Sequence, residues 1–335
     1  MKRLTPARLA AAGLLLLVIV GLVLWLAPSD SYIFLPDKAH PVAPLVSIPG
    51  GKEPADGGGI YFVDVFVRKA SWLERLFPGI REGSTIVPAS VVQPPGVSEK
   101  ARRKEDLRAM SRSQEVAAAV ALRTLGYKVS ARPTGVLVQD VARDAPAAGK
   151  LEPTDVIVSV DGRRVRTPGE LRKLLGARPV GTKFRIGVRR GNGLQQVTVR
   201  TVSDPSRRGH PILGIYVGQA ATVHLPLHVR INAGDVGGPS AGLAFALDIL
   251  EELGRDVDHG HRIAATGEID FDGTVEQIGG IRQKTIGVRE AGIHLFLVPA
   301  GENAVEARRY ADGVRIIPVK NFQQALRALA TLSAS

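Results

Sequence analysis

The stretch Asp235–Gly242 reads DVGGPSAG and separates two runs of different pattern. Residues 221–234 alternate as a strand does, and residues 241–254, AGLAFALDILEELG, have the apolar spacing of a helix that Gly254 closes. Ser240 is therefore expected at or just before a helix N-terminus, where unpaired backbone N–H groups favour negative charge. The letters G-x-S-x-G are also those of a nucleophile elbow, so Ser240 is either a nucleophile or a helix N-cap.

A nucleophilic serine needs a base, and histidine is the first kind to consider. In the α/β-hydrolases the chain order is Ser, acid, His, and the histidines after Ser240 are His259, His261 and His294. Too little chain follows Ser240 to build a full hydrolase sheet. A His-dependent esterase is therefore kept only as an alternative.

Lysine is the second kind of base. The chain has 32 Arg but only 12 Lys, and after residue 204 the only lysines are Lys284 and Lys320. Lys320 follows a predicted strand and is expected at the surface. Lys284 lies on a predicted helix and can face the core, because three apolar residues accompany it there, Ile281, Ile286 and Val288. Burial can lower the pKa of a lysine from about 10.4 toward about 7–8, which turns it into a base.

Residues 127–203 have the pattern of a small sheet with one helix. The segments are a strand TGVLVQDV (134–141), a hairpin DVIVSVDGRRV (155–165) turning at Asp161-Gly162, a helix TPGELRKLL (167–175) capped by Thr167, and two strands in KFRIGVRRGNGLQQVTVRTV (183–202). This unit resembles a PDZ domain of the bacterial type, although it has Pro153-Thr154-Asp155 where PDZ domains usually have Gly before the Asp. The resemblance implies that a peptide adds to the sheet as a strand. Backbone N–H groups of Gly135, Val136 and Leu137 would hold its C-terminal carboxylate.

The first 27 residues have the pattern of a membrane anchor. Lys2, Arg3 and Arg8 precede an uncharged, largely apolar stretch, residues 9–27, which is long enough to span a bilayer. The positive flank predicts a single pass through the cytoplasmic membrane, with the N-terminus inside and the rest of the chain outside. A cleaved signal peptide is the alternative.

The region between this stretch and the PDZ-like unit has a weaker pattern. Residues 28–58 are rich in Pro, Gly and Asp and indicate a linker. After it, Ile60–Arg68 predicts a strand, Ala70–Phe77 a short helix, and Ser98–Leu125 a long helix that ends at Gly126.

Composition excludes several classes of function. The formal net charge is +12, but only 5% of the residues are aromatic and no nucleic-acid-binding motif appears, so we expect no nucleic-acid partner. The chain has no Cys, which excludes a disulfide framework and a Cys-ligated zinc. GARPVGTK, residues 176–183, nearly spells a P-loop, but it ends in G-T-K where the motif requires G-K-[ST]. We expect no cofactor and no metal.

The C-terminal third carries a longer ordered pattern, GGPSAGLAFAL (237–247), ATGEIDFDGTVEQIGGIRQK (265–284) and AGIHLFLVPAGEN (291–303). Over residues 212–332 this resembles the proteolytic domain of Lon-type serine proteases. The resemblance implies that Ser240 and Lys284 form a catalytic dyad, that Thr266 orients the lysine, and that backbone N–H groups around Gly237, Gly238 and Ser240 form the oxyanion hole. Lon proper has an acidic residue three positions before the serine, where this chain has Gly237.

Taken together, these patterns predict an α+β protein with a transmembrane helix, a PDZ domain and a Lon-type α/β proteolytic domain. The predicted segments are a cytoplasmic tail (1–8), an anchor (9–27), a linker (28–58), a strand and helix that pack with the protease domain (59–126), the PDZ domain (127–203) and the proteolytic domain (211–332). The combination resembles the PDZ-containing, membrane-anchored Lon-like proteases of bacteria, which have no ATPase domain.

That resemblance implies an ATP-independent endopeptidase acting outside the cytoplasmic membrane. Its substrates would be unfolded proteins, or proteins presented to the PDZ domain by their C-termini. It also implies a homo-oligomer, specifically a hexamer. The alternative is a membrane-anchored PDZ adaptor whose protease-like domain is inactive.

Overall fold

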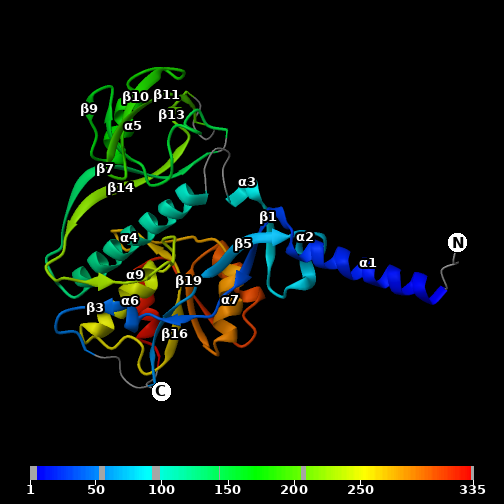
Figure 1. Cartoon of the computed structure of the whole chain (residues 1–335). Helices are drawn as coiled ribbons and strands as arrows, with labels where there is room; N and C mark the ends of the chain where they lie inside the picture. Colours follow the sequence, from blue (N-terminus) through cyan, green and yellow to red (C-terminus); the bar gives the residue numbers. More distant parts are fainter. Residues whose placement is uncertain (1–5, 53–56, 93–98, 143, 205–208, 333–335) are drawn as a thin grey trace.

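The computed structural model describes residues 6–52, 57–92, 99–142, 144–204 and 209–332. Residues 1–5 of the predicted tail, residues 53–56 of the predicted linker and Ser98 of the predicted helix lie outside the described residues. The chain forms a body built on a parallel sheet, and a second, antiparallel sheet stands apart from this body (Figure 1).

The body is built on a five-stranded sheet in the order β2-β4-β16-β19-β20. Its strands are β2 (His40–Pro41), β4 (Gly59–Phe62), β16 (Arg262–Ala265), β19 (Leu295–Pro299) and β20 (Arg315–Val319). All neighbours pair in parallel except β2, which is antiparallel to β4. A parallel sheet of this kind is covered on both faces, which explains why its inner strands β16 and β19 are buried over nearly their whole length.

Side-chain alternation along the strands divides the body into two cores. Ile263 and Ala265 of β16 face one core together with residues of α4 (Glu99–Thr124), α6 (Gly242–Glu252) and α9 (Phe322–Leu329). Ala264 faces the other core, together with residues of α7 (Ile281–Glu290) and α8 (Glu302–Arg309). The predicted long helix is confirmed as α4 within the described residues.

The region predicted as a strand at Ile60–Arg68 is divided between two sheets. β4 ends at Phe62, and β5 (Val65–Ser71) begins after Val63 and Asp64. β5 belongs to a three-stranded antiparallel sheet with β1 (Pro28–Pro36) and β6 (Thr85–Pro88), in the order β5-β1-β6. The interruption takes the backbone of Val63 and Asp64 out of both sheets, next to α7.

Residues 28–58 are more structured than the linker prediction indicates. They contain β1, β2, a 3-10 turn (Ala43–Leu45) and β3 (Val46–Ser47). Tyr32 and Ile33 are buried in β1, which pairs with β5 and β6 on its two edges. Val42 is buried in the core that also contains residues of α6. The Pro, Gly and Asp content conceals the apolar run in β1.

The second sheet has the order β11-β10-β8-β7-β14, and all of its pairs are antiparallel. Its strands are β7 (Ser130–Val141), β8 (Val156–Val160), β10 (Lys183–Arg190), β11 (Gly193–Arg200) and β14 (Ile215–His224), with β9 (Arg163–Arg164) paired to β8. The predicted turn at Asp161-Gly162 is confirmed by positive φ angles at both residues. The helix α5 (Pro168–Gly176) is capped by the Thr167 side chain, as predicted.

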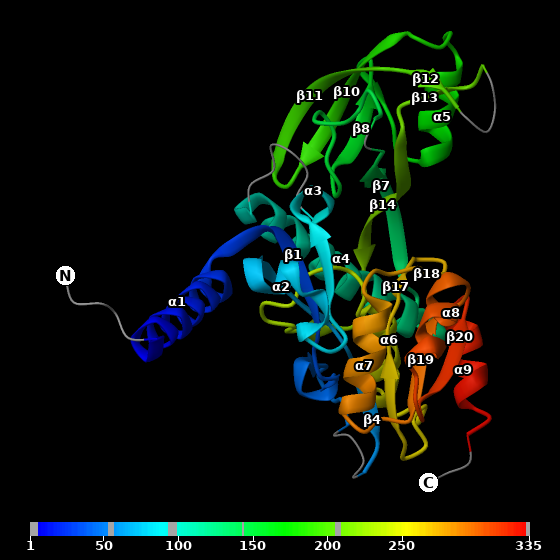
Figure 2. The same ribbon diagram turned by 90° about the vertical axis from the view of Figure 1, so that its right-hand side faces the viewer.

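One strand of this sheet lies outside the segment predicted for the PDZ domain. β14 follows residue 203 in the chain, and it pairs with β7 along nearly its whole length. The two strands form a ribbon that connects the second sheet to the body (Figure 2). The remaining short elements are α2 (Trp72–Leu76), a 3-10 turn (Pro78–Ile80), α3 (Ala89–Val92), β12 (Val202–Ser203), β13 (Pro211–Ile212), β15 (Arg230–Ile231), β17 (Glu268–Ile269) and β18 (Val275–Glu276).

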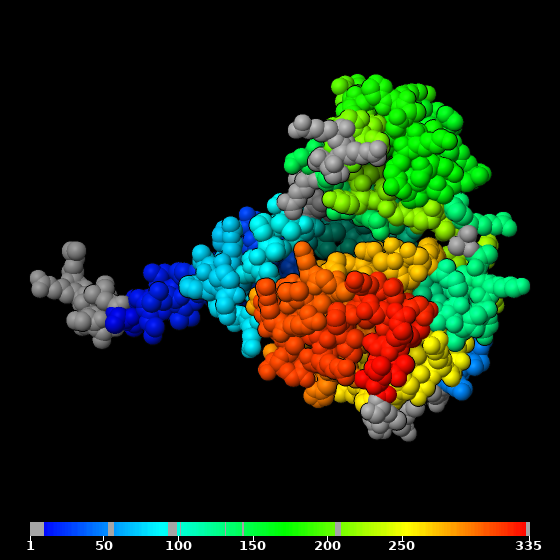
Figure 3. Space-filling view, turned by 180° about the vertical axis from the view of Figure 1, so that it is seen from behind, coloured from blue at the N-terminus to red at the C-terminus, as the bar shows by residue number. Residues whose placement is uncertain are grey.

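The first helix, α1 (Pro6–Leu26), projects from the body and is seen in blue in Figure 3. A membrane span needs about 20 consecutive apolar residues. No helix in the described part of the chain is both long enough and apolar enough to cross a membrane. The predicted transmembrane anchor over residues 9–27 is therefore wrong, and so is the single-pass topology that depended on it.

Candidate active site

The structure brings Ser240, Lys284 and Thr266 together. Lys284 Nζ lies 2.7 Å from Ser240 Oγ, 2.8 Å from the carbonyl oxygen of Val63 and 3.2 Å from Thr266 Oγ1. Thr266 is fully buried and Lys284 is only 3% exposed. A primary amine held this close to a serine hydroxyl can accept its proton once the amine is neutral.

Two local structures place the pair. Lys284 is on α7, which begins after Gly280, a residue in the left-handed conformation. Ser240 lies just before α6, whose N-cap is Ala241 and has no side-chain capping bond. Ser240 is therefore not the N-cap, and the capping interpretation of this serine is wrong.

The residues that directly follow β16 hold the backbone of Ser240. The Ser240 carbonyl oxygen accepts hydrogen bonds from the Gly267 N–H at 2.8 Å and from Thr266 Oγ1 at 3.1 Å. Thr266 thus contacts both members of the pair, because it also lies beside Lys284 Nζ. The threonine fixes the serine backbone relative to the amine.

Burial controls the protonation of Lys284. Loss of solvent lowers the pKa of this lysine from its ordinary value to about 8, while the charge of Asp64 raises it by a smaller amount. With a pKa near 8, about a tenth of the Lys284 side chains are neutral at pH 7. Sequence reasoning predicted the burial but missed Val63 and Asp64, whose role depends on the interruption between β4 and β5.

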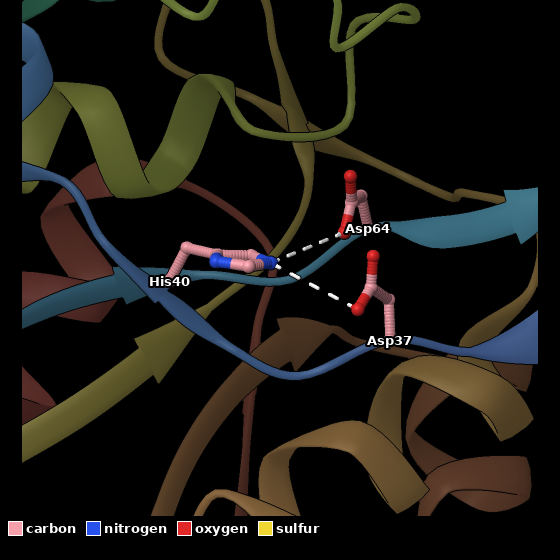
Figure 4. A group of neighbouring side chains, drawn as sticks. All are labelled: Asp37, His40 and Asp64. Atoms are coloured by element: carbon pink, nitrogen blue, oxygen red, sulfur yellow. Dashed lines mark ion pairs between the residues drawn. The ribbon is translucent and has the colours of Figure 1, made fainter.

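Asp64 belongs to a cluster with Asp37 and His40 (Figure 4). His40 Nε2 lies 4.0 Å from Asp37 Oδ1 and 4.0 Å from Asp64 Oδ1. Burial and the neighbouring Asp37 raise the pKa of Asp64, whose Oδ1 is buried without a hydrogen-bond partner. These three side chains are close enough together to hold a metal ion, and so are those of Glu251, Asp256 and Asp258. Exposed acidic groups are common without a bound ion. The expectation that the protein holds no metal stays a prediction.

The predicted oxyanion residues lie on the loop that precedes Ser240. Gly238 has a φ of +86°, which favours glycine. Its N–H donates to the carbonyl oxygen of Asp106 on α4 at 2.8 Å. A Cβ on Gly237 would lie 2.7 Å from Asp106 Cβ. Both glycines are thus at the site, but α4 engages the N–H of Gly238.

The predicted peptide-binding residues of the second sheet have no free edge. Gly135, Val136 and Leu137 pair with β14 on one side, and Val136 and Leu137 pair with β8 on the other. These residues therefore cannot accept an added strand. The outer edge beyond β7 belongs to β14, with α5 packed beside it.

The edge of β14 presents backbone groups at its first residue. The Ala142 N–H donates to the Gly214 carbonyl oxygen at 3.0 Å, and Ile215 pairs with Val141. Antiparallel ladders alternate, so the N–H and C=O of Ile215 point away from β7. Sequence reasoning missed this edge because β14 is distant in the chain from β7, the strand with which it pairs.

The histidines of the alternative hypothesis lie elsewhere in the fold. His259 has a positive φ and lies 3.5 Å from Asp256, and His261 directly precedes β16. His294 directly precedes β19, and its backbone carbonyl accepts from the Arg315 N–H. The amine that contacts Ser240 is that of Lys284, and Lys320 is exposed as predicted.

Comparisons with known families assign two parts of the chain. Residues 123–201 match the PDZ domain, and residues 214–331 match the Lon protease (S16) C-terminal proteolytic domain. Lon protease of Mesomycoplasma hyopneumoniae is 36% identical over 103 residues, which is 29% of this chain and 12% of that protein. Lon protease 2 of Bacillus subtilis is 34% identical over 101 residues, or 30% of this chain and 18% of that protein.

Among solved structures, the PDZ domain of an SdrC-like protein from Listeria monocytogenes is 28% identical, with a TM-score of 0.24. That likeness covers 25% of this chain and 87% of the solved one. The chain spans less than a fifth of the length of the two Lon proteases that it matches. The C-terminal match supports a serine peptidase, and the PDZ match supports peptide binding.

Proposed function

We propose that this protein is an ATP-independent endopeptidase in which Ser240 and Lys284 form the catalytic dyad. The observation that carries the proposal is the 2.7 Å contact between Lys284 Nζ and Ser240 Oγ, in a place where the lysine is buried. A buried lysine with a lowered pKa is suited to act as a general base at neutral pH. Arginine could not do this, because it stays protonated.

The chemistry follows from the contacts. Neutral Lys284 takes the proton of Ser240 Oγ as this oxygen attacks the carbonyl carbon of the peptide bond. The resulting ammonium gives its proton to the departing amine, which leaves an acyl-enzyme. Water then attacks the ester carbonyl while Lys284 takes a proton from it, and the ammonium returns this proton to Ser240 Oγ as the ester C–O bond breaks. Thr266 and the Val63 carbonyl hold the amine in place through both steps.

The proposed substrates are unfolded proteins and proteins presented by their C-termini. In support, the only P-loop-like stretch, GARPVGTK, departs from the motif, so we expect activity without ATP. We propose that a peptide adds to the free edge of β14, beside α5, rather than to Gly135–Leu137. The resemblance to Lon-type domains also leads us to expect a hexamer, which sedimentation can measure.

The test is hydrolysis of a loose, casein-like protein in buffer without nucleotide. We expect cleavage by the unmodified protein, loss of cleavage in Ser240→Ala and Lys284→Ala, and full activity in Lys320→Ala, the matched control for the lysine. If both dyad variants keep full activity, the assignment is wrong. If the unmodified protein never reacts with a serine-directed fluorophosphonate, the chain is better explained as a PDZ adaptor with an inactive protease-like domain.

A further inference from the structure

One segment of α4, residues 103–113, lies between the loop that carries Ser240 and the PDZ sheet. The helix itself belongs to the body, where its second half packs against α6. After α4 the chain enters β7, the first strand of the PDZ sheet. The same segment thus touches the proposed catalytic site and the proposed peptide-binding unit, and its contacts on each side can be named.

On the catalytic side, α4 holds the loop by its backbone. The carbonyl oxygen of Asp106 accepts from the Gly238 N–H at 2.8 Å, and Ser113 Oγ donates to the carbonyl oxygen of Pro239 at 2.8 Å. Arg103 also forms an exposed ion pair with Asp235 at 3.2 Å. These bonds fix the backbone on both sides of the proline that precedes Ser240.

The close approach explains the glycine at position 237. A Cβ there would lie 2.7 Å from Asp106 Cβ and 3.4 Å from the Asp106 carbonyl carbon. No side chain fits unless α4 moves away. Gly237, the residue that departs from the Lon pattern, is therefore the residue against which Asp106 of α4 packs.

On the PDZ side, α4 meets the turn between β10 and β11. The Arg108 guanidinium occupies the space where a Cβ of Gly191 would be. Arg112 Nη2 donates to the carbonyl oxygen of Gln219 in β14 at 2.8 Å. Glu105 and Glu152 line the same cavity between α4 and the PDZ sheet, and burial, together with the Glu152 carboxylate, raises the pKa of Glu105 to about 7.

A cavity separates parts of α4, the PDZ sheet and the catalytic loop from one another. This cavity of about 670 Å³ is lined by residues of α4, of the PDZ sheet and of the catalytic loop, including Gly238 and Pro239. The PDZ sheet is joined to the body mainly by the β7–β14 ribbon (Figure 2). A sheet that is attached by one ribbon can tilt, and a tilt changes the contacts that the sheet makes with α4.

We infer that residues 103–113 of α4 couple the position of the PDZ sheet to the catalytic loop, and that the contact between Asp106 and Gly238 is self-inhibiting. While the β10–β11 turn of the PDZ sheet contacts Arg108, the Asp106 carbonyl oxygen accepts a hydrogen bond from the Gly238 N–H. This N–H therefore cannot stabilise an oxyanion. A peptide that adds to β14 displaces the sheet, α4 shifts, and the N–H becomes available. This inference rests on the proposed function, because it assigns Gly238 to the oxyanion hole.

The experiment locks the PDZ turn onto α4. The chain has no Cys, so the pair Arg108→Cys and Asn192→Cys gives two unique thiols, which a short reducible bismaleimide joins. Two quantities are measured before and after reduction of the cross-link. One is the rate of Ser240 labelling by a fluorophosphonate, and the other is amide hydrogen exchange over residues 236–243. We expect the cross-link to slow labelling at least tenfold and to slow exchange, and reduction to restore both.

Equal exchange in the locked and reduced states overturns the coupling, whatever the labelling shows. Failure of the proposed function is different, because hydrogen exchange needs no catalysis. If the lock slows exchange but Ser240 is never labelled, the coupling stands and the dyad assignment fails. Each single-cysteine variant treated with the same reagent controls for modification of one thiol.

A second variant tests the catalytic side of α4. Ser113→Ala removes the hydroxyl that holds Pro239, so the loop should exchange faster and Ser240 should be labelled several-fold faster. Ser111→Ala is the matched control, because its hydroxyl bonds only within α4, to the Leu107 carbonyl. Slower labelling in Ser113→Ala would show that α4 supports an active loop, and would overturn the self-inhibiting contact.

Discussion

Two glycine-containing stretches were both predicted to bind a negatively charged group through backbone N–H groups. Their surroundings in the structure are different. Residues 235–242 form the loop before α6 and the first residue of that helix, against the first half of α4, with Ser240 beside a buried amine. Residues 134–138 lie within β7, between β8 and β14. In the first stretch, a hydroxyl meets an amine because α7 and the end of β16 place Lys284 and Thr266 beside Ser240. The second is closed because another strand, distant in the chain, occupies its edge.

A backbone binding site depends on which N–H and C=O groups remain unpaired in the folded chain. In the loop before α6, the Gly238 N–H is paired by a single contact with another helix, since it donates to the Asp106 carbonyl oxygen of α4. A strand keeps its N–H groups free only if no other strand pairs with it.

The largest effect is expected at Lys284, the base of the proposed dyad. Lys284→Arg keeps a positive charge, but arginine cannot accept the Ser240 proton at neutral pH. We expect kcat for a peptide substrate to fall by about 10³-fold or more. Lys320→Arg makes the same change at an exposed lysine and should leave kcat unchanged. Retained activity in Lys284→Arg would remove the lysine from the proposed mechanism.

A stability effect is expected inside β7. A Cβ on Gly135 would lie 2.5 Å from Val156 Cγ1 and 2.6 Å from the Ile157 carbonyl oxygen. Gly135→Ala should therefore destabilise the PDZ unit by about 1–3 kcal/mol, measured by urea unfolding. Gly176→Ala, at the end of α5 with open space around its Cβ position, is the control. An unaltered unfolding midpoint in Gly135→Ala would mean that β7 is not clamped between two strands.

A binding effect is expected at the edge of β14. Ile215→Pro removes an N–H that points away from β7 without removing a bond to that strand. Loss of one hydrogen bond should weaken the affinity for C-terminal peptides about 5- to 10-fold, with Ile215→Val as the control. Binding to a panel of peptides with free and amidated C-termini measures this. Undiminished binding in the proline variant would place the groove elsewhere.

The smallest effect is expected from Asp64. The carboxylate of Asp64 raises the pKa of Lys284, so Asp64→Asn should lower that pKa. Activity requires the neutral amine, and the acid limb of the kcat/KM profile should therefore move to lower pH, by less than about one unit. The cluster also contains Asp37 and His40, and both remain in the variant. A shift toward higher pH would contradict the assigned sign.

The contributions of local pattern and long-range pairing can be separated residue by residue. The helices α4, α5, α6 and α7, and the turn at Asp161-Gly162, follow from periodicity and capping within a few residues. Lys284 was identifiable because lysine is rare in an arginine-rich region and because its helix has an apolar face. By contrast, β14 could not be assigned to the PDZ sheet from sequence, since the pairing joins residues about 80 positions apart.

The sequence alone determined which residue types were available for the chemistry: a serine before a helix, one lysine on an apolar helical face, and a threonine at the end of a strand. Tertiary structure alone decided that the Val63 carbonyl holds the lysine, that β14 rather than β7 offers a free edge, and that Asp106 holds the Gly238 N–H. The physical reason is that periodicity, caps and turns act over a few residues, whereas burial and backbone pairing depend on segments that meet only in the folded chain.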